Sequence, residues 1–257
     1  MDSSKGTTTP PKNTKKAVYL IRHAESEENR KISALVRSCN SLRKFSLPKS
    51  DDVFTSARLL NIPAQVDSSV SDIGTEQISH MGDKLKREKF VQSRKIELVV
   101  HSPLLRARQT SLGMLGCLSA SADDDVTKKA DTVVRVIQTE LLLEKSLTEW
   151  TPLYFSGFLD RIKGFEAWLG EQPERTIAVV GHSQFFKAML GVEFKFDNCE
   201  VWKVDFNSAA ADDVNNIIRD TGNGASSSSY NDDTSSRWSN LDKIYGCEVK
   251  SSPRTVK

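Results

Sequence analysis

Long apolar runs are missing from this sequence of 257 residues. No uninterrupted stretch reaches the roughly 18 apolar residues that a membrane-spanning helix needs, and the first residues lack the apolar core of a secretory signal. We therefore expect a protein that has no membrane partner and that lies in the cytoplasm.

Cysteine and histidine are scarce, with four residues of each type. Their spacing matches neither C-x-x-C nor H-E-x-x-H, so neither a disulfide framework nor a zinc site is indicated. An excess of charge is missing as well, because 36 Lys and Arg residues face 34 Asp and Glu residues. This balance argues against the strongly basic surface of a dedicated nucleic-acid binder. We expect no metal, no cofactor and no nucleic-acid partner.

The composition changes along the chain and predicts one folded domain with polar flanks. Residues 1–16 are rich in Ser, Thr, Pro and Lys, which is typical of a flexible arm. Residues 17–206 carry the apolar patterns of a core, and residues 207–237 have the Ser- and Asp-rich composition of a linker. In residues 238–257, aromatic and β-branched side chains return, so this end is either a short strand that docks on the domain or a partner-binding motif.

Four short apolar runs predict buried strands at residues 17–21, 96–100, 133–137 and 176–180. Helical spacing lies between them, as in Ile162, Phe165 and Leu169. Strands that alternate with helices indicate an α/β fold, a three-layer sandwich with a largely parallel central sheet flanked by helices. Ligands bind beyond the carboxyl ends of the strands in such sheets.

Histidine and arginine follow these strands where a ligand would bind. The first strand leads into Arg22-His23-Ala24-Glu25-Ser26-Glu27-Glu28-Asn29. A histidine at a strand exit is often only structural. If one ring nitrogen is tied to the backbone, however, the other can attack phosphorus, and guanidinium groups can bind the phosphate oxygens.

Two further segments complete the pattern. Residues 102–110 read SPLLRARQT and include Arg106, and the fourth strand ends in Gly181-His182-Ser183. Together, the three segments resemble the motifs R-H-G-E-x-x-x-N, S-x-L-x-R-A-x-x-T and G-H-S of the histidine phosphatase superfamily, also called the phosphoglycerate mutase-like family. The chain departs from this pattern at Ala24, where the family usually has glycine.

The resemblance implies a role for each matching residue. His23 would be the nucleophile that becomes phosphohistidine, and the acid that protonates the leaving group would follow the third strand. Glu144 matches that position better than Glu140, and we expect the leucines around Glu144 to raise its pKa. A further segment, residues 71–77 (SDIGTEQ), resembles the family's L-S/T-x-x-G-x-x-Q element. The remaining implied site residues bind the phosphate group or shape its pocket: Arg22, Asn29, Ser71, Gly74, Arg106 and His182.

The sequence therefore predicts a metal-independent phosphomonoester hydrolase that works through a phosphohistidine. Its substrate would be a phosphorylated small molecule or a phosphoprotein. A mutase-type phosphotransferase with the same pocket is one alternative, and a catalytically weak module that binds phosphorylated ligands is another. The identity of the substrate and the oligomeric state stay open.

Overall fold

The computed structural model describes residues 15–43, 67–116, 134–144, 155–208 and 237–251. They form one six-stranded sheet in the order β3-β2-β4-β1-β5-β6. The first four strands of that order are mutually parallel. At the other edge, β5 pairs antiparallel with β1, and β6 pairs antiparallel with β5. The strands are β1 (Lys15–Arg22), β2 (Leu98–His101), β3 (Arg135–Gln138), β4 (Thr176–Gly181), β5 (Val201–Asn207) and β6 (Trp238–Tyr245).

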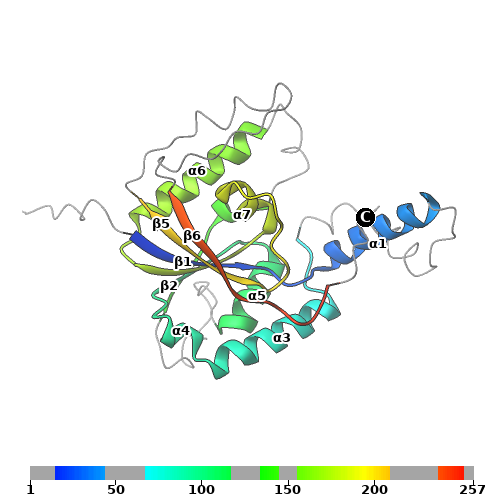
Figure 1. The fold of residues 1–257 in the computed structure, drawn as a ribbon, viewed down its shortest axis with the longest axis horizontal. Coiled ribbons are helices and arrows are strands. Elements are labelled where there is room, and N and C mark those ends of the chain that lie inside the picture. The colour runs from blue at the N-terminus through cyan, green and yellow to red at the C-terminus, as the bar shows by residue number, and fades with distance from the viewer. Residues whose placement is uncertain (1–14, 44–66, 117–133, 145–154, 209–236, 252–257) are drawn as a thin grey trace, which may run out of the picture.

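Helices cover both faces of the sheet (Figure 1), so the predicted α/β sandwich is confirmed. Neighbouring side chains of each central strand point to opposite faces. Val100 packs toward α6 (Phe155–Glu171) and α7 (Ser183–Leu190), whereas Val99 packs toward α3 (Asp72–Arg87) and α5 (Leu105–Leu115). No helix within the described ranges is long and apolar enough to cross a membrane. The helices are α1 (Glu27–Arg43), α3 (Asp72–Arg87), α4 (Phe90–Ser93), α5 (Leu105–Leu115), the 3₁₀ helix η3 (Glu140–Leu142), α6 (Phe155–Glu171) and α7 (Ser183–Leu190).

The first strand begins at Lys15, so it includes the last two residues of the expected flexible arm, 1–16. Lys15 and Lys16 pair with Asn207 and Phe206 of β5. Lys16 is buried, and its ammonium group donates hydrogen bonds to the carbonyl oxygens of Gln172 and Glu174, the latter at 2.9 Å. A lysine with these backbone partners can be buried in a strand, which composition alone did not indicate. Residues 1–14 of the expected arm lie outside the described residues.

The antiparallel edge of the sheet corrects the expected start of the linker. Asn207 is the last residue of β5, and its N–H donates a hydrogen bond to the Arg237 carbonyl at 2.8 Å. Trp238–Tyr245 pairs with β5 as strand β6, so this part of the C-terminal end is docked on the domain. The sequence of β5 does not predict a strand clearly, because its side chains alternate irregularly between buried and half-buried. Residues 209–236 lie outside the described part of the chain.

Candidate active site

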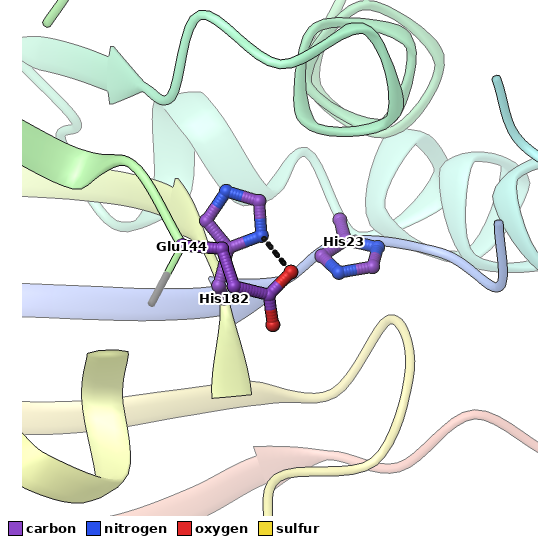
Figure 2. Close-up of side chains that lie close together, drawn as sticks. All are labelled: His23, Glu144 and His182. Carbon is purple, nitrogen blue, oxygen red and sulfur yellow. Dashed lines mark ion pairs between the residues drawn. The ribbon is translucent and has the colours of Figure 1, made fainter. Parts of the chain in front are cut away.

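The two predicted site histidines come from neighbouring parallel strands. Arg22 at the end of β1 is in register with Gly181 at the end of β4. The next residue of each chain segment is a histidine, and the His23 N–H donates a hydrogen bond to the Gly181 carbonyl at 3.0 Å. The ring centroids of His23 and His182 are consequently 5.0 Å apart (Figure 2). Parallel pairing thus creates this histidine pair at the carboxyl edge of the sheet.

The His23 imidazole is buried and tied to the backbone through one nitrogen. Its Nδ1 lies 2.6 Å from the Ala24 carbonyl oxygen, which can only accept a hydrogen bond, so Nδ1 carries the proton. Burial lowers the pKa of His23 well below its usual range, and the nearby His182 and Arg106 lower it further. His23 is therefore neutral at neutral pH, and the lone pair of its Nε2 is available.

His182 joins the site to the loop after β2. Its Nε2 lies 2.9 Å from the Ser102 hydroxyl, and its Nδ1 lies 3.4 Å from Oε2 of Glu144. Burial lowers the pKa of His182, although the Glu144 carboxylate acts in the opposite direction. Glycine fits before this residue without displacing its neighbour, whereas an added Cβ on Gly181 would come 2.9 Å from the Phe186 ring, which would have to shift.

Glu144 lies between His182 and Arg106. Nη2 of Arg106 donates a 2.6 Å hydrogen bond to Oε2 of Glu144, and about a quarter of the Glu144 side chain (27%) is exposed. The alternative acid, Glu140, is exposed at the start of η3. The structure thus brings Glu144, and not Glu140, to the histidines (Figure 2).

The expected pKa shift of Glu144 is wrong in direction. Burial does raise the pKa of this carboxyl, but His182, Arg106 and His23 together lower it well below its usual range. The neighbouring Leu142, which was expected to desolvate the carboxyl, instead packs in the core beside α6. The free site therefore holds Glu144 as a carboxylate.

Glu28 is a site residue that the sequence analysis missed. It lies in the first turn of α1, and its Oε2 is 3.5 Å from Nη1 of Arg106. Burial raises the pKa of Glu28, and Arg106 only partly offsets this effect. Its place inside the first motif, one residue before Asn29, was the available signal. Arg106 is thus flanked by two carboxylates.

Arg22 and Asn29 are the two other residues of the first motif that were expected to bind phosphate. Nη1 of Arg22 donates a hydrogen bond to the Phe196 carbonyl at 2.7 Å, and its charge contributes to the lowered pKa of His23. The backbone N–H of Asn29 donates a hydrogen bond to the Ser26 hydroxyl at 3.2 Å. The Asn29 Oδ1 atom is buried and has no hydrogen-bond partner among the described residues. The phosphate-binding roles of both residues stay predictions.

Ser71 and Gly74 contact the loop after His23 and not the histidines themselves. The Ser71 hydroxyl caps α3 by accepting the Gly74 N–H at 3.1 Å, and it lies 3.0 Å from Oε1 of Glu25. An added Cβ on Gly74 would come 2.0 Å from the Glu25 carbonyl oxygen. These contacts indicate that Ser71 and Gly74 position the loop, while direct binding of phosphate by them stays a prediction.

The same cluster contains the donor atoms that a metal ion would need. His23, Glu144 and His182 each offer one ligand atom, and these atoms all lie within 4.8 Å of one another. However, the Glu144 oxygen that faces His182 already accepts a hydrogen bond from Arg106. A guanidinium group at this distance favours an anion over a cation in the same place.

Comparisons with known proteins find similarity in structure. No protein-family model matches the sequence, and no curated protein matches it. The structure is similar to that of an Escherichia coli protein described as an alpha-ribazole-5'-P phosphatase, with 17% identity, a TM-score of 0.45, and coverage of 75% of this chain and 91% of that one. It is also similar to a mycobacterial glucosyl-3-phosphoglycerate phosphatase, with 14% identity, a TM-score of 0.42, and coverage of 75% and 91%.

A third similar structure is Bacillus stearothermophilus YhfR, with 14% identity, a TM-score of 0.43, and coverage of 73% of this chain and 90% of that one. The first two of these neighbours are named as phosphatases.

Proposed function

We propose that this protein hydrolyses phosphomonoesters through a phosphohistidine formed at His23. The observation that carries the proposal is the hydrogen bond from His23 Nδ1 to the Ala24 carbonyl, which leaves Nε2 as a neutral nucleophile beside Arg106, Glu144 and His182. The match of these residues to the motifs of the histidine phosphatase superfamily supports the same reaction. The substrate class is a phosphorylated small molecule or a phosphoprotein.

In the first step, the lone pair of His23 Nε2 attacks phosphorus. The N–P bond forms while the P–O bond to the leaving group breaks. Arg106 and Arg22 stabilise the negative charge on the other phosphate oxygens, and this charge stabilisation is the main requirement of phosphoryl transfer. Glu144, when protonated, gives its proton to the leaving oxygen.

Glu144 takes up that proton from solvent when the substrate binds, because binding raises the pKa of the carboxyl group. His182 and Arg106 hold its pKa low in the free site, but a phosphate dianion beside Arg106 would offset the positive charge of that guanidinium and raise the pKa. The bound substrate would also cover the exposed part of the carboxyl group, which raises the pKa further. Substrate binding thus prepares Glu144 to act as an acid.

In the second step, water replaces the departed alcohol. The Glu144 carboxylate takes a proton from this water, whose oxygen attacks phosphorus as the N–P bond breaks. The electron pair of that bond returns to His23 Nε2, so the neutral imidazole is restored. Inorganic phosphate leaves, and no step requires a metal ion.

The test is phosphate release from a phosphomonoester in the presence of a chelator. We expect turnover by the parent chain and none by His23→Asn. His80→Asn provides a matched control, because His80 is a half-buried histidine whose Nε2 lies 3.8 Å from Glu248 on the surface. Equal rates for the parent chain and His23→Asn would refute the proposal.

A further inference from the structure

The described C-terminal residues reach the loop that carries His23. After β6, the chain continues through residues 246–251, which we call the C-terminal segment, and runs along α3 toward the start of α1 (Figure 1). Two of its acceptors, the Val249 carbonyl and the Ser251 hydroxyl, receive hydrogen bonds from Nε2 of Gln77 at 3.2 and 3.0 Å. The Ser251 hydroxyl in turn donates to Oδ1 of Asn198 at 2.8 Å.

The side-chain amides of Gln77 and Asn198 also bind backbone groups at or next to His23, through the ends that face away from Ser251. Oε1 of Gln77 accepts the Glu25 N–H at 2.8 Å, and Nδ2 of Asn198 donates to the His23 carbonyl at 2.7 Å. The Gln77 and Asn198 side chains are almost fully buried. An amide has a donor end and an acceptor end, so a partner at one end determines which atom faces the other way.

The peptide unit between Ala24 and Glu25 connects Gln77 to the His23 ring. Its N–H is bound by Gln77, and its carbonyl oxygen is the acceptor for Nδ1 of His23. Because a peptide unit is planar, the bond to Gln77 also fixes the direction of the carbonyl. That direction determines which His23 nitrogen carries the proton.

We propose that Ser251 is a positioning residue for the nucleophile, because its hydroxyl orients Asn198 and, together with the Val249 carbonyl, Gln77, and thereby holds His23 in the tautomer with a free Nε2. This inference rests on the proposed function for its catalytic consequence, whereas the tautomer itself is independent of turnover. Ser251 does not touch the reacting atoms. It acts across a sequence separation of 174 residues from Gln77.

The experiment compares the full-length parent with Ser251→Ala, Ser251→Thr and Ser239→Ala. Ser251→Ala removes the hydroxyl, whereas Ser251→Thr retains it. Ser239→Ala removes a hydroxyl from the exposed part of β6, and it serves as the matched control. The first readout is the nitrogen NMR spectrum of His23 without substrate, which reports the tautomer and the pKa of the ring. The second is the pair kcat and KM for a phosphomonoester.

We expect Ser251→Ala to show a mixture of His23 tautomers and a kcat about tenfold lower, with KM within about twofold, because a displaced nucleophile slows the chemical step more than it weakens binding. Ser251→Thr and Ser239→Ala should match the parent. An unchanged His23 spectrum in a folded Ser251→Ala chain would overturn this inference, whether or not the parent is active. Absence of turnover in the parent would instead refute the proposed function.

Discussion

The guanidinium of Arg106 and the carboxylate of Glu144 are joined by a 2.6 Å hydrogen bond across 38 residues of sequence. His182 and then the charge of Arg106 lower the pKa of Glu144 in the free site, and the bond occupies one donor of the arginine that is proposed to bind phosphate. A phosphate group that binds to Arg106 competes for the same donor. The proposed function therefore links binding of substrate and protonation of the acid through one residue.

Replacement of Glu144 by Gln tests its role as the acid. With an alkyl phosphate, we expect kcat to fall by roughly 10²–10⁴-fold, because the leaving alkoxide needs a proton. With a nitrophenyl phosphate, the rate of the first step, measured as the burst of nitrophenolate, should fall much less, since a nitrophenolate leaves without protonation. The second step should be slowed with both substrates, because it uses Glu144 as the base. Glu140→Gln is the control and should behave as the parent with both substrates. Equal losses of the first-step rate on both substrates in Glu144→Gln would argue against an acid role.

Replacement of Arg106 by Lys tests binding of the phosphate group. Lysine keeps the charge but loses the planar pair of donors, so inorganic phosphate should inhibit less strongly, with an inhibition constant at least about tenfold higher. The measurement is competitive inhibition by phosphate, or binding of phosphate by calorimetry. Arg135→Lys changes an exposed arginine paired with Glu174, and it should leave the constant unchanged. Equal constants for Arg106→Lys and the parent would count against this site for phosphate.

The paired histidines and the fold were predictable because parallel β1 and β4 are continuous apolar runs whose ends adjoin His23 and His182. Sequence could not show that Arg106 would lower the pKa of Glu144, because local leucines do not reveal which side chains face the carboxyl. The contacts of Ser251 were equally hidden, since they depend on where β6 docks.

Replacement of Gly74 by Ala tests the packing behind the His23 loop. The new Cβ would overlap the Glu25 carbonyl oxygen, so the free energy of unfolding should fall by about 1–3 kcal/mol, as in other overpacked sites. Activity should fall with it, because the carbonyl belongs to the loop after the nucleophile. Chemical denaturation measures the change.

Gly157→Ala is the opposite case and serves as a control. Nothing lies within 4 Å of the new Cβ in helix α6, so stability should rise by up to about 1 kcal/mol. A Gly74→Ala chain as stable as the parent would show that the loop can move away without cost.

The pKa values of His23 and His182 predict how stability depends on pH. Burial lowers both below the ordinary value of 6.5, so the unfolded chain binds more protons below that pH. The free energy of unfolding should therefore fall as the pH decreases from about 6.5, by up to about 1.4 kcal/mol per pH unit for each histidine. Well above pH 6.5, these two histidines should no longer make the free energy of unfolding depend on pH.

Denaturation at pH 7.5, 6.5 and 5.5 measures this slope in the parent and in His23→Asn. The variant has lost one of the two imidazoles, so its stability should depend less steeply on pH below 6.5. An identical slope in both chains would contradict the lowered pKa of His23.

The most direct test of the central claim is to trap the phosphoryl-enzyme. The chain is mixed with a phosphomonoester labelled on phosphorus, quenched in alkali within milliseconds and analysed by mass spectrometry. We predict one phosphoryl group per chain, stable in alkali and labile in acid, on Nε2 of His23, with none on His23→Asn. Turnover without any label on His23, or with the label on another residue, would contradict the account.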